Sequence, residues 1–166
     1  MALLNTGGVL EQYASPDEML AAPANAFVEQ FIGEDRGIKR LQLRTVGELP
    51  FHRGPVLDAD ATVDEARAMA VTMRTEWIGL VDGDRFLGWI HVDALDGGRP
   101  LRSMPAELPA ALLVPESTLR TAMDLIMATN TSVAVIDDGG RFGGVVTLEQ
   151  IREGLRVPVD RGVPSP

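Results

Sequence analysis

One short stretch occurs twice in this chain, as DGDRFLG at Asp82–Gly88 and as DGGRFGG at Asp138–Gly144. The copies are 56 residues apart, and the same offset places Thr62–Leu95 on Thr118–Ile151 without a gap. Eight of these 34 paired positions are identical. A duplication of this length indicates a supersecondary unit that was built twice. We therefore expect two similar units that bury apolar faces against each other and leave clefts between them.

Each copy predicts the element order β-α-β-β-α. An Asp-Gly turn between two runs rich in β-branched and aromatic residues is a strong hairpin signal. The expected spans are 56–57, 61–73, 77–81, 86–91 and a short helix from 92 in the first copy, and 112–114, 117–128, 133–136, 142–147 and 148–155 in the second. The sequence thus predicts an α+β fold in which the two tandem repeats pack as one module.

The segment before the repeats predicts a short strand over 8–13 followed by two helices. The first helix begins with Ser15, Pro16 and Glu18, the pattern of a capping box with proline at the first helical position. The second helix is expected over 25–33, where glycine ends it. This segment is too short to be expected to hold a core of its own.

Composition excludes several classes of protein. The formal net charge of −9 argues against general affinity for nucleic acid, because phosphate binding needs a basic face. The absence of cysteine excludes disulfides and thiolate metal sites. The two histidines, His52 and His91, lie on unrelated segments, so neither a catalytic triad nor a metal-ligand spacing can be assembled. We expect a module that binds ligands without chemistry of its own and without a metal.

The repeats resemble the CBS domain over about residues 56–155, and two in tandem resemble a Bateman module. The second copy carries the better match, in Leu113–Leu119 and Gly144–Thr147, and the first is looser, in Leu57–Val63 and Gly88–His91. The resemblance implies a small regulatory pair that binds an adenine nucleotide, or cyclic di-AMP in a symmetric dimer.

A second resemblance covers the N-terminus. Residues 8–41 are similar to the C-terminal end of an ABC-transporter ATPase domain and to its junction with a tandem CBS pair in osmoprotectant importers of the glycine betaine/proline type. The phosphate-binding motif Gly-x-x-x-x-Gly-Lys-Ser/Thr is missing, because Lys39 is the only lysine and lacks the glycines. The expected domains are an ATPase remnant (1–40), a linker (41–55), CBS repeats (56–100 and 101–156) and a flexible tail (157–166).

Backbone groups of the first and middle strands are expected to hold the edge of an adenine, and the N-termini of the last helices suit ribose or phosphate. The candidate binding residues are Leu57, Trp77, His91, Leu113, Val133, Arg141, Thr147 and Gln150. The ribose-binding Asp of the CBS family is replaced by Gln150 in the second copy and by Ala94 in the first. These departures weaken the expectation of a standard nucleotide site.

Several candidates have a structural alternative. Thr147 is equally well placed to cap a helix, Arg141 to be solvated on its hairpin, and Trp77 to pack in the core. The basic connector has two interpretations as well: a solvated linker, or a patch that contacts anionic lipid and answers to ionic strength. That patch would consist of Arg36, Lys39, Arg40 and Arg44.

The resemblance implies a regulatory module of an importer for glycine betaine, carnitine, choline or proline. Such a module would form a homodimer through its CBS helices and act beside the ATPase domain and the membrane permease subunits, at the cytoplasmic face of the cell membrane. Two alternatives remain: a ligand-free dimerisation module, and a stand-alone CBS-pair protein unrelated to transport.

Overall fold

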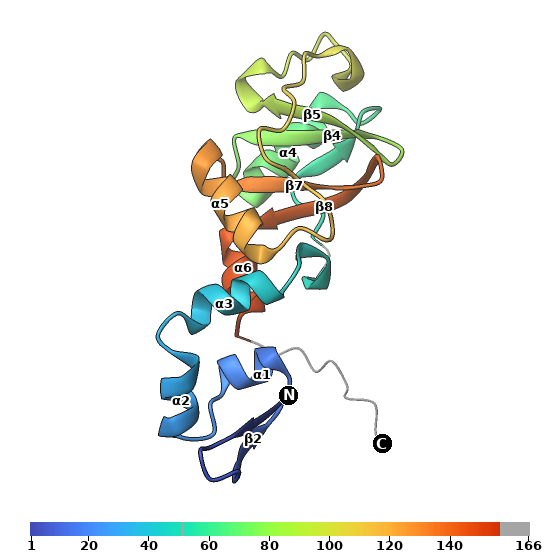
Figure 1. Cartoon of the computed structure of the whole chain (residues 1–166). Coiled ribbons are helices and arrows are strands. Elements are labelled where there is room, and N and C mark those ends of the chain that lie inside the picture. Colours follow the sequence, from blue (N-terminus) through green and yellow to red (C-terminus); the bar gives the residue numbers. More distant parts are fainter. Residues whose placement is uncertain (51, 157–166) are drawn as a thin grey trace.

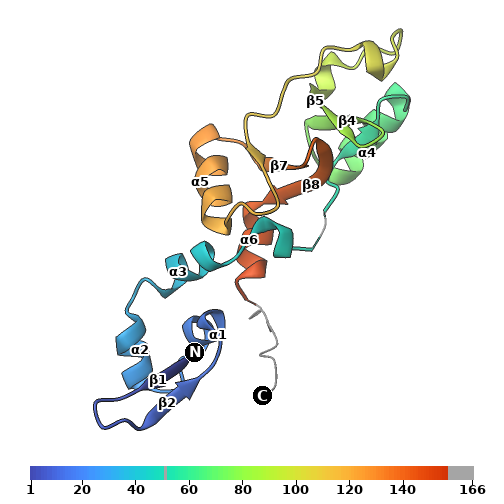
Figure 2. The same cartoon turned by 45° about the vertical axis from the view of Figure 1, so that its right-hand side comes forward.

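The computed structural model describes residues 1–50 and 52–156. Two three-stranded sheets lie next to each other, and a smaller N-terminal unit lies beyond the second sheet (Figure 1, Figure 2). In chain order the elements are β1 (Ala2–Leu4), β2 (Leu10–Tyr13), α1 (Pro16–Ala21), α2 (Ala26–Ile32), α3 (Arg36–Leu43), η1 (Val46–Glu48), β3 (Val56–Asp58), α4 (Val63–Met73), β4 (Trp77–Asp82), β5 (Arg85–His91), η2 (Val92–Ala94), η3 (Leu101–Ser103), β6 (Leu112–Leu113), α5 (Leu119–Thr129), β7 (Val133–Asp138), β8 (Arg141–Thr147) and α6 (Leu148–Gly154).

The two repeats have the same topology, which confirms the expected α+β fold. Their sheets have the strand orders β3-β4-β5 and β6-β7-β8, with the first pair parallel and the second antiparallel. The predicted Asp-Gly turns close both hairpins. The copies differ most clearly at their ends, where α6 is an α-helix but η2 is a three-residue 3-10 turn.

Equivalent residues cap the long helix of each repeat and pack it against its sheet. Thr62 and Thr118 cap α4 and α5, each accepting a hydrogen bond from the backbone N–H three residues later. Such a cap stabilises a helix by about 1 kcal/mol. Ala66 and Ala122 are fully buried, and their small side chains let each helix lie close to its own sheet.

The copies share an interface, as the duplication predicted. Phe86 stacks on Phe142, its equivalent in the other repeat, with ring centroids 5.4 Å apart. Each last strand is also paired with the segment that leads into the other repeat. Trp89 exchanges two 2.8 Å backbone hydrogen bonds with Glu107, and the N–H of Val145 donates to the carbonyl of His52 at 2.8 Å.

Glycine is required where this crossing is tightest. Gly88 has φ +140°, and a Cβ there would lie 2.6 Å from the carbonyl oxygen of Glu107. A side chain at this position would push the crossing segment off β5.

The first two helices of the N-terminal unit follow their sequence signals closely. Ser15 and Glu18 form the predicted capping box of α1, and Asn25 caps α2. Strand β1, which was not predicted, pairs antiparallel with β2. The expectation that this segment has no core of its own is wrong, because four of its residues form a small buried cluster: Leu3, Met19, Val28 and Ile32.

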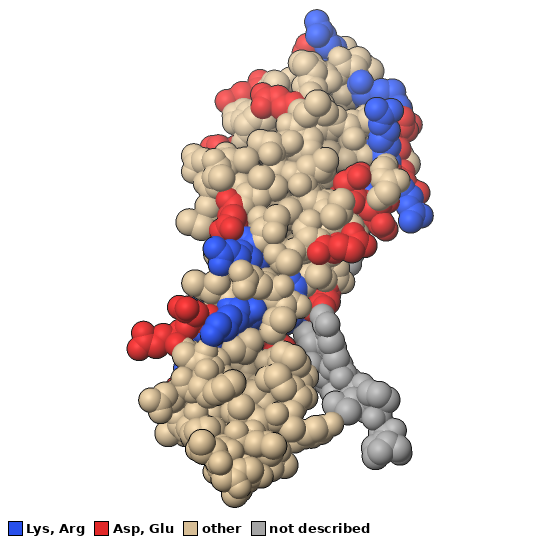
Figure 3. Space-filling model, in the orientation of Figure 1, with Lys and Arg blue, Asp and Glu red and all other residues tan. Residues whose placement is uncertain are grey.

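Helix α3 joins the N-terminal unit to the repeats (Figure 2), and both basic and acidic side chains show at the surface in the region of this helix (Figure 3). It spans Arg36–Leu43 and therefore crosses the boundary expected at residue 40. No helix within residues 1–50 and 52–156 is long and apolar enough to cross a membrane. The expected flexible tail, 157–166, lies outside the described residues.

Arg102, in the segment between the repeats, ties that segment to the first repeat. Its guanidinium lies 2.9 Å from an Oδ1 of Asp60 and 2.8 Å from an Oδ2 of Asp82. Hydrogen bonds from Arg102 hold the pKa of both carboxyls below its ordinary value.

Replacement of Arg102 by methionine should therefore destabilise the fold in a pH-dependent way. A carboxyl whose folded pKa is depressed stabilises the fold above its unfolded pKa, about 4, and this contribution is lost as pH falls through the folded pKa. We expect the variant to melt at a lower temperature than the parent at pH 7 and the difference to shrink toward about pH 3. Calorimetry at both pH values measures this, with Arg99→Met as the control. A difference independent of pH would contradict the assignment.

Candidate functional site

A cavity of about 310 Å³ opens between the repeats, where β4 and β7 begin. Three pairs of equivalent positions meet in it, Pro55 with Ala111, Thr75 with Thr131, and Trp77 with Val133. The remaining lining residues are Trp89, Glu107, Leu108, Pro109, Ala110, Asn130 and Ser132. This is the cleft expected from two similar units packed face to face.

Two tryptophans from neighbouring strands form one wall of the cavity. In the β4–β5 register Trp77 lies opposite His91 and Gly79 lies opposite Trp89, so both indoles project from the same face of the sheet. The rings of Trp77 and His91 contact each other edge-on, with centroids 5.0 Å apart. Trp77 nevertheless remains 37 % exposed. A Cβ on Gly79 would lie 3.0 Å from the indole of Trp89, so glycine leaves the space that this ring occupies.

The polar part of the lining is acidic and neutral. Among the lining residues Glu107 carries a carboxylate, Asn130 carries an amide, and three residues carry hydroxyls: Thr75, Thr131 and Ser132. None of the described residues that line this cavity is Lys or Arg. The cavity therefore offers aromatic surface, hydrogen-bonding groups and negative charge.

The sequence-predicted residues do not all gather there. Trp77 and Val133 line the cavity. His91 lies beside Trp77, and its Nδ1 accepts a hydrogen bond from the backbone N–H of Asp93 at 3.3 Å. Leu57 is half-buried in β3, and Leu113 is only 3 % exposed in β6, which leaves its side chain no surface for a ligand.

The remaining three candidates lie elsewhere. The Thr147 hydroxyl accepts from the N–H of Gln150 at 3.2 Å, and the Gln150 side chain accepts from the N–H of Thr147 at 2.9 Å. Both side chains thus form the capping box of α6. Gln150 also borders a second cavity of about 150 Å³. Arg141 is exposed on its hairpin, 3.6 Å from Asp138.

Trp89 and Glu107 line the cavity but were not among the binding residues predicted from the sequence. Alternation across the predicted hairpin could have placed Trp89 on the same face as Trp77. Glu107 comes from an irregular segment, and no local pattern indicates its position.

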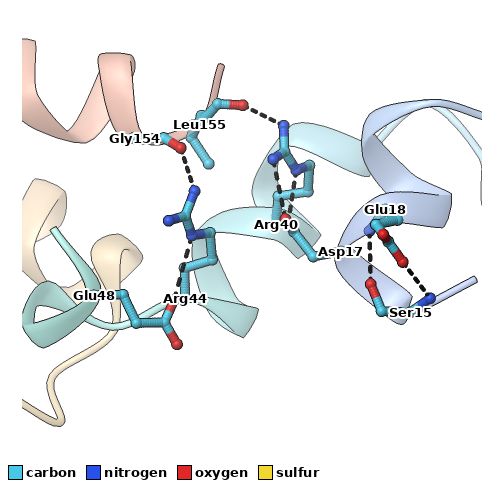
Figure 4. Close-up of polar contacts among 8 residues, drawn as sticks. All are labelled: Ser15, Asp17, Glu18, Arg40, Arg44, Glu48, Gly154 and Leu155. Carbon is cyan, nitrogen blue, oxygen red and sulfur yellow. Dashed lines mark hydrogen bonds and ion pairs between the residues drawn. The ribbon is translucent and has the colours of Figure 1, made fainter. Parts of the chain in front are cut away.

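A second polar site joins the N-terminal unit to the second repeat (Figure 4). Arg40 on α3 forms a bidentate ion pair with Asp17 on α1, with Nε 2.8 Å from Oδ1 and Nη2 3.2 Å from Oδ2. Its Nη1 also donates a hydrogen bond to the carbonyl of Leu155. Arg44 pairs with Glu48 at 3.3 Å and donates to the carbonyl of Gly154. Two cations therefore face the C-terminal end of α6, the negative end of a helix. We refer to Asp17, Arg40, Arg44 and the end of α6 as the arginine junction.

This junction changes the interpretation of the basic connector. Arg40 and Arg44 are only 9 % and 5 % exposed, so they are not available to lipid. Arg36 pairs with Glu29 at 3.2 Å, and Lys39 donates to the carbonyl of Ile32 at 2.6 Å. The expected lipid-facing patch of four cations is therefore wrong, because two of the four are used inside the fold.

Comparison with known proteins identifies the repeats. Residues 107–157 match the CBS domain family. The solved CBS domain of a bacterial CNNM/CorC-family Mg²⁺ transporter in complex with ATP has the same fold, with a TM-score of 0.58 and 19 % identity over 76 % of this chain and 97 % of that one.

Relatives in sequence match most of the chain. The osmoprotectant import ATP-binding protein OsmV of Salmonella typhimurium is 29 % identical over 89 % of this chain and 40 % of its own length. The glycine betaine/carnitine/choline transport ATP-binding protein OpuCA of Bacillus subtilis is 30 % identical over 84 % of this chain and 38 % of its own length. The chain thus spans about two fifths of these relatives. It contains a tandem CBS domain pair, and its homologues are ATP-binding subunits of osmoprotectant ABC transporters.

Proposed function

We propose that this chain is the regulatory module of an osmoprotectant ABC importer, and that it binds a ligand between its repeats and passes the effect to an ATPase domain. The observation that carries the proposal is the cavity lined by equivalent positions of both repeats. The functions of its relatives support transport of glycine betaine, carnitine or choline as the setting. In that setting the module acts at the inner face of the membrane, beside the permease subunits.

An adenine nucleotide is the ligand that we propose for the cavity, because a CBS pair of the same fold was solved with ATP. The exposed indole of Trp77 offers a stacking face for the base, and Asn130, Thr131 and Ser132 offer hydrogen bonds. With no Lys or Arg among the described lining residues, the phosphates would point to solvent. Cyclic di-AMP is the variant ligand that two paired modules could share.

The arginine junction supplies a route from the repeats to the N-terminal unit. Helix α6 begins at the capping box of Thr147. At its other end, Arg40 and Arg44 donate hydrogen bonds to the last carbonyls of the helix. Arg40 is in turn bound to Asp17 of α1. A displacement of α6 must therefore move or break these contacts. We propose that residues 1–40 are the end of an ATPase domain, and that a displacement of α6 changes the position of that domain.

Pairing of two modules through the CBS helices is the third part of the proposal. Val71 on α4 and Met127 on α5 occupy equivalent positions of the repeat and are 79 % and 65 % exposed. Apolar side chains repeated on both helices favour burial against a second copy.

Titration with AMP, ATP and cyclic di-AMP tests the ligand proposal. We expect calorimetric binding of at least one of them, and Trp77→Leu should weaken it by about tenfold because base–indole stacking contributes about 1–3 kcal/mol. Arg141→Ala, on the exposed hairpin, is the matched control and should bind as the parent does. Absence of binding by all three nucleotides would favour the ligand-free dimerisation module.

Sedimentation velocity tests pairing through the helices. The double variant Val71→Asp, Met127→Asp should weaken self-association by about tenfold or more, because it places charges where apolar side chains would be buried. The control Gly97→Asp adds a charge at an open position of the inter-repeat segment. A parent chain that stays monomeric at high concentration would contradict the dimer.

Replacement of Arg40 by methionine tests the junction. Removing one partner of a buried ion pair lowers the stability of the fold by about 3–5 kcal/mol. The N-terminal unit should therefore lose protection from amide hydrogen exchange. Replacing both partners, in Arg40→Met with Asp17→Leu, should recover part of the loss. Arg36→Met removes an exposed pair and should cost less than about 1 kcal/mol. If Arg36→Met and Arg40→Met reduced the protection of the N-terminal unit equally, the proposal that the arginine junction transmits the effect would be wrong.

A further inference from the structure

We propose that the cavity between the repeats also binds a small quaternary ammonium compound, which sits against Trp77 and Trp89 with its charge facing Glu107 and competes with the nucleotide. This inference rests on the proposed function only in taking the cavity as a ligand site. Nothing in the resemblance to CBS domains implies a cationic ligand.

The charges around the cavity favour a cation over an anion. Glu107 is the ionisable residue among its described lining residues. Next to the cavity, His91 contacts the indole of Trp77 and lies 4.0 Å from a carboxylate oxygen of Glu76 and 3.5 Å from one of Asp93. A phosphate inside the cavity would meet this negative charge with no Lys or Arg among the described lining residues, whereas a cation would be attracted by it.

The aromatic wall selects the kind of cation. The face of an indole attracts a positive charge within about 6 Å of the ring, and aromatic residues grouped around a cation are the usual way in which proteins bind quaternary ammonium. Such a cation donates no hydrogen bonds and is weakly hydrated, so the apolar part of the lining, Leu108, Pro109 and Ala110, imposes little desolvation cost on it. A primary ammonium or a metal ion would lose strong hydration in the same place.

The rest of the lining suits the other end of such a molecule. Thr131 and Ser132 directly precede β7, on the side of the second repeat. Their hydroxyls can bond the hydroxyl or carboxylate that osmoprotective ammonium compounds carry. If the chain regulates an importer, the ligand of this site belongs to the class of the transported solute, and binding would report its accumulation.

Choline and its uncharged isostere 3,3-dimethylbutan-1-ol test the inference, because they have the same shape and differ in charge. Binding is followed by tryptophan fluorescence and calorimetry on the full chain. We expect choline to bind and the isostere to bind about tenfold more weakly or not at all. Glu107→Gln and Trp77→Leu should each weaken choline binding by about 3- to 30-fold, the range that single cation–π and charge contacts allow. Arg141→Ala should have no effect.

Nucleotide titration of the same proteins separates this inference from the proposed function. Glu107→Gln should leave AMP binding unchanged or tighter, since it removes a negative charge, and choline should compete with AMP. AMP binding without choline binding would overturn the inference and keep the proposal. Choline binding that is insensitive to Glu107→Gln and Trp77→Leu would overturn the site. If neither AMP nor choline bound, both the further inference and the proposed ligand site would be wrong. Melting temperatures of the variants verify that they are folded.

Discussion

The module depends on the crossing of the two repeats, in which each copy's leading segment is hydrogen-bonded to the other copy's last strand. Trp89 and Glu107 form one crossing, Val145 and His52 the other, and the stacked Phe86 and Phe142 lie between the sheets. A three-stranded sheet has a free edge at its last strand, and an unpaired edge is both unstable and prone to aggregation. Because each repeat covers the edge of the other, neither is complete alone, and the cavity exists only while both are in place.

The arginine junction shows how the environment changes the role of a charged residue. A cluster of arginines in an irregular connector looks like a surface feature, since isolated charges are seldom buried. Once α3 forms, however, Arg40 points at Asp17 and both Arg40 and Arg44 reach the free carbonyls at the end of α6. Buried cations with several hydrogen bonds fix geometry more than they add stability. The junction therefore fits a part that must hold two units in a defined relation.

How much the sequence could predict depended on whether the relevant signal was local. The repeats, their hairpins and the capping box at Ser15 are set by residues near one another in the chain, and the structure contains them as expected. Thr147 caps α6, which is one of the two roles that the sequence left open for it. Glu107, by contrast, enters the cavity through a pairing with β5 that no periodicity reveals. Arg40 was misplaced for the same reason, because its partners lie 23 and 115 residues away. Residues set by long-range contacts need the fold before their role can be inferred.

The lining of the cavity also bears on what this CBS pair could recognise, since the chain lacks the Asp that the resemblance to CBS domains implies for ribose binding. Gln150 occupies one such position, and its side-chain oxygen is engaged by the backbone N–H of Thr147. Ala94, at the other, offers no polar side chain. What the chain has instead are two indoles and an acidic residue at the boundary between the repeats. Aromatic surface accepts both a nucleobase and a quaternary ammonium group, but a carboxylate favours only the second. In our proposal the charge at residue 107 is therefore the feature that decides between the two ligands.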